Sequence, residues 1–143
     1  ELYGEIKNIR PDVPVALTGF TIQPMETVAG EKAVLATTAS NEADIRSAAG
    51  RLEKEHGCTV TGITPHLSRR EELSRDLQQM LPGADIFLTE LKAAAVDVGV
   101  KRAGEYGKKT VFLHNRPVLY GGDIDSLEEA IMALTGRDKT RRR

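Results

Sequence analysis

The chain has 143 residues, a mass of 15.6 kDa and a formal net charge of −1. Its hydrophobic content of 40% is enough to build one core, which excludes a disordered protein, and its length excludes two large domains. The near-neutral charge provides no general field for attracting nucleic acid or an anionic membrane, so neither partner is expected.

The first ten residues carry a helical pattern. Leu2, Ile6 and Ile9 recur at helical spacing with no capping residue before them. Such a segment is typical of the end of an element rather than its beginning. We therefore expect the chain to be a fragment of a longer protein.

The next twenty residues contain one strand pattern and a connection. Residues 13–20 form a short apolar run in which Pro14 favours an edge strand over a central one. Residues 21–32 mix proline, glycine and polar residues without periodicity, which predicts a linker or domain crossover. Residues 1–31 are thus interpreted as the end of a preceding domain and a linker, and residues 32–143 as an α/β domain.

Strand and helix patterns alternate from residue 33 onwards. In the first helix pattern, four apolar residues share one face, and Gly57 is expected at the C-cap. In the second helix pattern, Ser68 and Glu71 predict a capping box. A final basic tail follows the last helix and is interpreted as solvated. The expected elements are a strand at 33–39, a helix at 42–56, a strand at 59–64, a helix at 68–81, a strand at 84–91, a helix at 93–106, a strand at 109–115 and a helix at 126–134.

This alternation predicts the fold class. Strands joined by helices of ten to fifteen residues form right-handed crossovers, which give a mainly parallel sheet covered on both faces. We expect a Rossmann-like three-layer α/β domain with about four or five strands. Such sheets bind ligands at the carboxyl ends of their strands.

Hydrogen-bond donors and cations follow the expected strands. Helix N-termini face the same edge, and both features favour an anion. A compact polyanion that carries phosphate or carboxylate groups would suit this edge, and the pattern identifies no catalytic residue. The residues predicted to bind the anion are Thr37, Thr38, Asn41, Arg69, Arg70, Lys92, Asn115 and Arg116.

Several of these residues have a simpler structural interpretation. Asn41 and its neighbours are ordinary helix-capping residues, whereas cations in a first helical turn oppose the dipole and so favour a functional role for Arg69 and Arg70. His66 and His114 lack local metal-ligand spacing and are interpreted as surface histidines, although both follow expected strands. Glu90 is a weak candidate for holding Mg²⁺.

Other features exclude several classes of site. No P-loop and no dinucleotide-binding glycine motif occurs in the chain. The single cysteine, Cys58, forms no internal disulfide and suits a reducing compartment. No apolar run is long enough for a membrane span, and no signal peptide is present, so a cytoplasmic protein is expected.

The run ADIFLTELKAAAVDVGVKRAGEYGKKTVFLHNRP, at 84–117, resembles the carboxyl-terminal part of cyclic 2,3-diphosphoglycerate synthetases from methanogenic archaea. GEKAVLATTA at 30–39, the TGIT-HLSRR-EL pattern at 61–73, and HNRP followed by Gly121-Gly122 fit the same region in the same order. The resemblance covers about residues 24–125.

The resemblance implies an enzyme that uses ATP and Mg²⁺ to close a phosphoanhydride ring on 2,3-bisphosphoglycerate. In that enzyme the predicted anion-binding residues would neutralise and orient the two phosphates: Arg69, Arg70, Lys92 and Arg116 by their charge, and Thr37, Thr38 and Asn115 as donors. The resemblance also implies an upstream P-loop domain in the same protein, so the fragment alone is expected to bind no cofactor and to be inactive. Two alternatives stay open: a non-catalytic Rossmann-like module for interaction or homodimerisation, and part of a kinase for another phosphorylated small molecule.

Overall fold

The computed structural model describes residues 2–138, which form two compact units. The larger unit is Ile22–Asn115, and the smaller unit combines the chain before residue 22 with the chain after residue 115. Strands β1 (Ala16–Pro24) and β5 (Lys109–Gly122) each contribute residues to both units. That residues 1–31 end a preceding domain stays a prediction.

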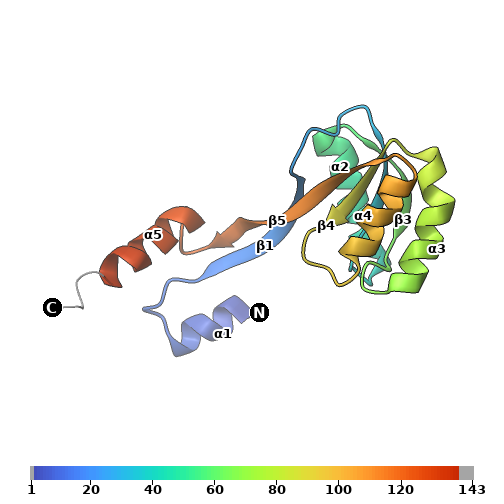
Figure 1. The fold of residues 1–143 in the computed structure, drawn as a ribbon. Helices are drawn as coiled ribbons and strands as arrows, with labels where there is room; N and C mark the ends of the chain where they lie inside the picture. Colours follow the sequence, from blue (N-terminus) through green and yellow to red (C-terminus); the bar gives the residue numbers. More distant parts are fainter. Residues whose placement is uncertain (1, 139–143) are drawn as a thin grey trace. The chain divides into compact units, whose positions relative to one another are not determined.

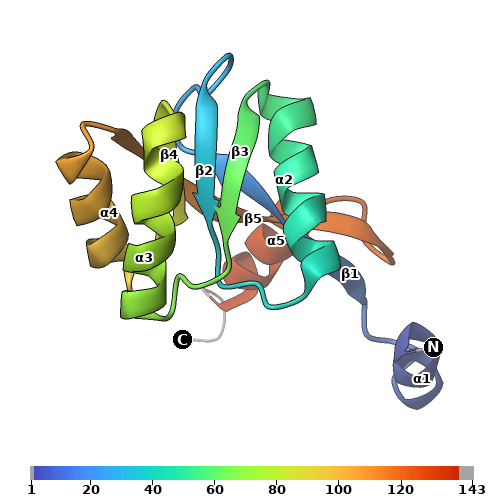
Figure 2. The same ribbon diagram turned by 90° about the vertical axis from the view of Figure 1, so that its right-hand side faces the viewer.

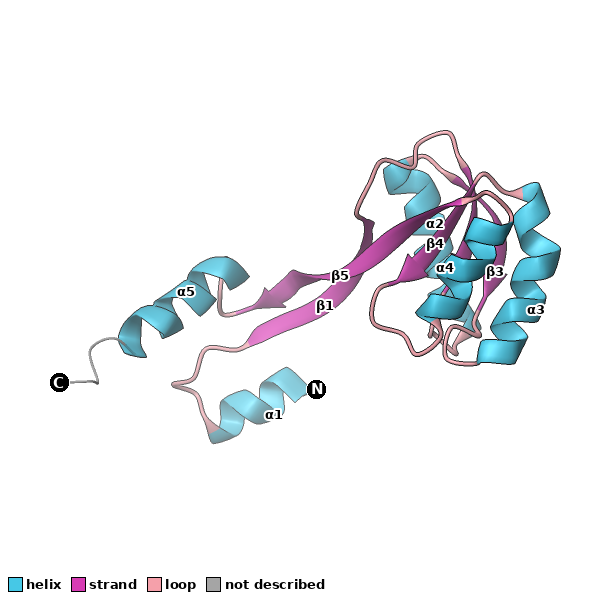
Figure 3. Ribbon diagram, in the orientation of Figure 1, coloured by secondary structure: helices cyan, strands magenta, loops and turns pink. Residues whose placement is uncertain are grey.

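Strands and helices alternate in the larger unit (Figures 1 and 3). Each buried strand pattern and each amphipathic pattern expected between residues 33 and 115 forms an element of the expected type. In chain order these are β2 (Lys32–Ala36), α2 (Glu42–His56), β3 (Thr59–Thr64), α3 (Arg70–Met80), the 3₁₀ turn η1 (Leu81–Gly83), β4 (Ile86–Glu90), α4 (Val96–Glu105) and β5.

The sheet has five strands in the order β1-β5-β4-β2-β3. The pairs β2–β3, β2–β4 and β4–β5 are all parallel, which confirms the expected Rossmann-like α/β class with a mainly parallel sheet. The expected edge strand is also confirmed, since β1 lies at one end of this order. Ala36 pairs with Thr64 on one side and Thr89 on the other, so these strands end at the same level.

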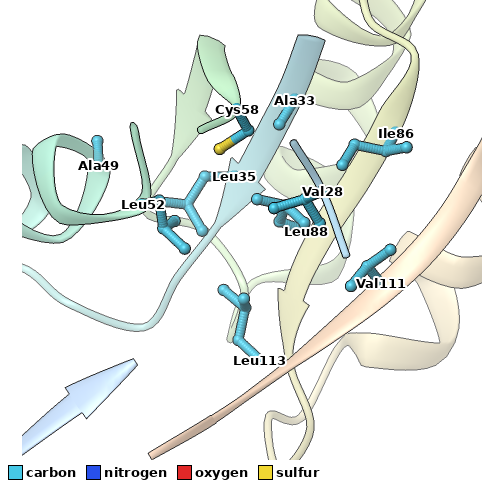
Figure 4. Packing of buried hydrophobic residues seen from close by; sticks show 10 residues of the cluster. All are labelled: Val28, Ala33, Leu35, Ala49, Leu52, Cys58, Ile86, Leu88, Val111 and Leu113. Carbon is cyan, nitrogen blue, oxygen red and sulfur yellow. The ribbon is translucent and has the colours of Figure 1, made fainter. Parts of the chain in front are cut away.

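Side chains of the central strands alternate between two buried layers. Leu35 and Leu88 pack in one cluster with Leu52 of α2, whereas Val34 and Phe87 pack in the other with residues of α3 and α4. Figure 2 shows the helices around the sheet, and Figure 4 shows the cluster on the α2 side. Both faces of the sheet are therefore covered, which explains why its strands read as continuous apolar runs.

Helix α2 begins and ends as its sequence predicts. The Asn41 side chain accepts a hydrogen bond from Ala43 N at 2.8 Å, and Gly57 has the left-handed φ of 72° that favours glycine. Ala49 and Leu52 supply its buried face. The capping and periodicity signals are both local, so they could be recognised without knowledge of the tertiary structure.

The beginnings of the next two helices differ from expectation. The Ser68–Glu71 capping box is wrong: α3 has Arg69 at its N-cap, with no side-chain capping bond, because residues 66–69 form a separate turn closed by Arg69 N to His66 O at 2.8 Å. Helix α4 begins at Val96 rather than 93. There, Ala95 N donates to Leu67 O at 3.1 Å and ties the preceding segment to the turn before α3.

The outer strands are longer than expected. Residues 21–24, interpreted as part of a linker, belong to β1, and β5 continues beyond the expected end at residue 115 to Gly122. These two strands are neighbours in the sheet. The length of each strand therefore depends on pairing with a strand far away in the sequence. The local sequence pattern does not predict that length.

The smaller unit contains α1 (Leu2–Ile9) and α5 (Leu127–Asp138) beside the outer parts of β1 and β5. Helical spacing of its apolar residues correctly predicts α1. The basic tail at 139–143 lies outside the described residues. Across residues 2–138, no helix combines the length and apolar character needed to cross a membrane.

Asp123 connects three parts of the smaller unit. Its carboxylate lies 2.6 Å from Lys7 Nζ and accepts hydrogen bonds from the Tyr3 hydroxyl at 2.5 Å and from Val15 N at 2.9 Å. These contacts, led by the Lys7 bond, lower the Asp123 pKa from 3.8 to about 2. The Asp123 bond also raises the pKa of Tyr3.

We expect this carboxylate to stabilise the smaller unit above pH 3.8 and to lose its effect as the pH falls towards 2. The folded-state pKa is depressed, so the unfolded chain binds the proton first and acid favours unfolding. Urea denaturation of the wild type and Asp123→Asn should differ at neutral pH and converge near pH 2. Asp125→Asn is the control, and a difference that persists in strong acid would contradict the assignment.

Candidate functional site

The carboxyl ends of four parallel strands meet at one edge of the larger unit. Register sets this geometry, because Glu90 at the end of β4 pairs with Leu113 of β5, and Thr89 pairs with Ala36 of β2. The polar residues that follow β4 therefore lie between those that follow β2 and those in the middle of β5. The expectation that such residues gather at this edge holds for Thr37, Glu90 and Asn115.

Glu90 is held by the two threonines that follow β2. Thr37 Oγ1 donates to Glu90 Oε1 at 2.5 Å, and Thr38 N donates to the same oxygen at 3.1 Å. The second carboxylate oxygen, Oε2, accepts from Thr38 Oγ1 at 3.0 Å. These bonds connect the β2 loop to the end of β4 and fix the direction of both threonine side chains.

The bonds to Glu90 limit the hydrogen bonds that Thr37 and Thr38 can form with a ligand. The one hydroxyl proton of Thr37 is directed at Glu90, and its oxygen accepts from Ala39 N at 3.1 Å. Thr37 is also buried, so it shapes the loop, and a direct phosphate contact would require its bond to Glu90 to open. Phosphate binding by Thr37 and Thr38 stays a prediction.

Glu90 is the weak candidate for a magnesium ligand, and its carboxylate is partly engaged in this structure. Both of its oxygens already accept hydrogen bonds from the threonines. Within residues 2–138, no group of three or more His, Cys, Asp or Glu side chains is placed to hold a metal ion. Because Mg²⁺ in proteins is usually bound by one or two carboxylates together with substrate phosphates, a magnesium role for Glu90 stays a prediction.

A pocket of about 260 Å³ opens beside Glu90. Two leucines supply apolar walls, whereas Lys92 supplies a cation and Asn115 an amide. In the described part of the chain, Lys92 is exposed and forms no ion pair, so its charge is available to an anion. The pocket is lined by Glu90, Leu91, Lys92, Leu113, His114 and Asn115.

Asn41 caps α2. Its side-chain oxygen is bonded to Ala43 N, so the simpler interpretation of this residue is confirmed. The amide nitrogen of Asn41 remains as a donor. A phosphate contact by that group stays a prediction.

Arg70 lies at the start of α3 and is paired with Asp97 of α4. Its Nη1 and Nη2 atoms donate to Asp97 Oδ1 and Oδ2 at 2.9 and 2.5 Å, and Nη1 also donates to Ala94 O at 3.3 Å. The bidentate bond raises the Arg70 pKa and lowers the Asp97 pKa. The pair is exposed, at 58% and 66%, so it adds little to stability.

The Arg70 pair lines a different hollow from Lys92. That hollow lies between α3 and α4 and includes Ser74, Lys101 and Arg102. Arg69 occupies the N-cap of α3 and is exposed. A phosphate role for Arg70 requires its guanidinium to leave Asp97 first, and the roles of both arginines stay predictions.

Arg116 belongs to the smaller unit. It lines a mainly apolar pocket of about 450 Å³ there, beside residues of α5 that include Ile131 and Met132. Its expected contact with a phosphorylated ligand stays a prediction.

A further polar network follows β3. It includes His66, which the sequence analysis interpreted as a surface histidine. His66 Nδ1 lies 2.7 Å from Asp76 Oδ2, and the same oxygen accepts from Thr64 Oγ1 at 2.6 Å. Asp76 lies in α3, ten residues beyond His66 in the sequence. No motif joins the two residues, so only the packing of α3 against β3 brings them together.

Comparison with known proteins identifies relatives with one common description. Residues 24–116 match the family model described as the cyclic 2,3-diphosphoglycerate synthetase C-terminal domain. The cyclic 2,3-diphosphoglycerate synthetase of Methanothermobacter thermautotrophicus is 40% identical over 138 residues, which cover 96% of this chain and 29% of that protein.

Two further synthetases of the same name give similar values. The Rubrobacter xylanophilus protein is 39% identical over 99% of this chain and 31% of its own length. The Methanothermus fervidus protein is 42% identical over 90% of this chain and 28% of its own length. The chain therefore spans slightly under a third of the length of these curated relatives.

Proposed function

Because the chain belongs to the cyclic 2,3-diphosphoglycerate synthetase C-terminal domain family, we propose that it forms the carboxyl-terminal part of an ATP-dependent enzyme that closes an intramolecular phosphoanhydride in 2,3-bisphosphoglycerate. The single observation that carries this proposal is the family match over residues 24–116. The substrate, ATP dependence and ligase activity are proposed for the whole protein.

The pocket beside Glu90 is the proposed contact with substrate. A small bisphosphorylated acid carries several negative charges, and Lys92 places a cation at the pocket with no competing partner in residues 2–138. The Asn115 amide supplies a directional donor. Together they would neutralise and orient one phosphoryl group, which is the main requirement for catalysis of phosphoryl transfer.

ATP and Mg²⁺ are assigned to the remainder of the protein. This chain has no P-loop motif, and Glu90 is engaged by the two threonines. We propose that an upstream P-loop domain holds the nucleotide and metal, and that the 143-residue chain alone has no turnover. The larger unit then supplies one wall of a composite site in a cytoplasmic enzyme.

The experiment is a comparison of the complete protein with the 143-residue chain. Both are incubated with ATP, Mg²⁺ and 2,3-bisphosphoglycerate, and ³¹P NMR follows the cyclic product. We expect product only from the complete protein, and salt-sensitive binding of 2,3-bisphosphoglycerate by the chain alone. A complete protein that consumes ATP with a different phosphorylated substrate would instead support a kinase.

A non-catalytic interaction module is the second candidate function. The observation that favours it is the exposure of large apolar side chains in the smaller unit, including Ile9 at 78%, Phe20 at 65% and Met132 at 65%. Such side chains are typical of a surface that contacts another protein surface. A stable homodimer of the chain that binds no 2,3-bisphosphoglycerate would favour this alternative.

A further inference from the structure

The network after β3 consists of Thr64, Asp76 of α3 and the partly exposed ring of His66. Thr64 is fully buried, and its hydroxyl donates to Asp76 Oδ2 at 2.6 Å. Asp76 Oδ2 also lies 2.7 Å from His66 Nδ1. The side chains of His66 and Asp76 are 32% and 25% exposed. The sheet thus fixes the carboxylate, and the carboxylate fixes the imidazole.

This contact defines which ring nitrogen is available for chemistry. An ionised carboxylate only accepts hydrogen bonds, so His66 Nδ1 carries the proton that bonds to Asp76. In the neutral ring, the lone pair is then on Nε2. No hydrogen bond to Nε2 occurs among the described residues. An Asp–His pair of this kind orients an imidazole and stabilises its charged form after proton transfer.

A purely structural role does not account for the imidazole. His66 N already donates to Thr64 Oγ1 at 3.2 Å, and Arg69 N donates to His66 O at 2.8 Å, so the turn is closed without the imidazole. The Thr64–Asp76 bond ties α3 to β3 without any contribution from the ring. The ring adds an oriented and accessible basic nitrogen to the edge where ligands of such sheets bind.

We propose that His66 is a catalytic proton acceptor of the synthetase and that Asp76 is its positioning residue. This inference rests on the proposed function. The strand β3 is two positions from β4 in the sheet, about 10 Å at ordinary strand spacing. With the reach of the Lys92 and His66 side chains, a bisphosphorylated ligand that contacts Lys92 can extend to His66.

The proposed step forms one P–O bond and breaks another. His66 Nε2 takes the proton from a P–OH group of 2,3-bisphosphoglycerate, and the freed oxygen electron pair attacks the second phosphorus to form the P–O–P bond. The bond that breaks joins that second phosphorus to an orthophosphate group that ATP has donated earlier. Orthophosphate leaves with the bonding electron pair, ADP having left when ATP donated the group, and Asp76 stabilises the imidazolium.

The first test uses substitutions in the complete enzyme. We expect His66→Gln to lower kcat by about 10²- to 10⁴-fold with little change in the melting temperature, because proton transfer is lost. Asp76→Asn should lower kcat at least about tenfold, because the imidazolium loses its counter-charge. His56→Gln, in the last turn of α2, is the matched control and should keep wild-type activity. Wild-type kcat in His66→Gln would overturn the proposal.

The second test separates chemistry from folding. Added imidazole should partly restore the activity of His66→Gly and should not restore that of Lys92→Ala. In the unmodified chain, ¹⁵N NMR should show the Nδ1–H tautomer of His66, and 2,3-bisphosphoglycerate should shift its Nε2 resonance. Absence of that shift would overturn the inference even if His66→Gly fails to fold. If the complete protein forms no cyclic product, the proposed function fails instead.

Discussion

Replacing Lys92 by alanine in the complete enzyme is expected to lower kcat/KM for 2,3-bisphosphoglycerate by about 10²- to 10³-fold. Lys92 lines the pocket beside Glu90 and forms no ion pair within residues 2–138. Without the Lys92 cation, the pocket lining keeps the negative charge of the Glu90 carboxylate, and that charge repels a phosphoryl group. Steady-state kinetics with matched thermal melts would measure the loss of activity separately from any loss of folding.

Two other substitutions sharpen this test. Lys54→Ala removes a lysine from the last turn of α2, away from the carboxyl ends of the strands, and should leave activity unchanged. Arg70→Ala should lower activity less than Lys92→Ala, because the Arg70 guanidinium is already bonded to Asp97. Wild-type turnover in Lys92→Ala would remove Lys92 from the substrate site.

The central part of the fold could be predicted because its signals are local. Strand β2 is apolar on both faces, and α2 carries both an Asn41 cap and a terminal Gly57. The length of β5 could not be predicted in this way, because its second half depends on β1, about a hundred residues earlier. The start of α3 was missed for a related reason: the turn at 66–69 interrupts an otherwise plausible capping pattern.

The sequence predicted at which edge of the sheet the candidate site lies, but it did not predict the side-chain contacts there. The rule for parallel sheets correctly places Lys92 and Asn115 together. It cannot show that Asp97 holds Arg70 across 27 residues, or that Asp76 holds His66. Those pairs depend on how α3 and α4 are rotated against the sheet. Residue type alone therefore overestimates the number of free cations and overlooks an oriented histidine.

The stability of the larger unit is expected to depend strongly on Phe87. This residue is the second of strand β4 and is completely buried. Phe87→Ala should lower the free energy of unfolding by about 3–5 kcal/mol, because it removes apolar contacts and leaves a cavity. The melting temperature should fall by at least about 10 °C.

Phe20→Ala is the control for this substitution. Phe20 is 65% exposed, so its loss should change the free energy of unfolding by less than about 0.5 kcal/mol. Urea denaturation followed by circular dichroism measures both variants. Equal losses for the two phenylalanines would contradict the assignment of Phe87 to the core.

Helix α4 approaches Phe87 closely at Gly99. We therefore expect the effects of substitutions at Gly99 and Phe87 on the free energy of unfolding to be coupled. A β-carbon at Gly99 would lie 2.8 Å from Cε1 and Cζ of the ring, so Gly99→Ala should destabilise the unit by about 1–3 kcal/mol. In the Phe87→Leu background those two ring atoms are absent, and the cost of Gly99→Ala should fall by about 1 kcal/mol or more.

Gly104→Ala provides the opposite result on the same helix. A β-carbon at position 104 meets no atom within 4 Å, so alanine should stabilise α4 by about 0.5–1 kcal/mol through its higher helix propensity. The two glycines therefore separate steric contact with the sheet from intrinsic helix propensity. If Gly99→Ala were also stabilising, α4 could not approach β4 at Phe87 as closely as the structure shows.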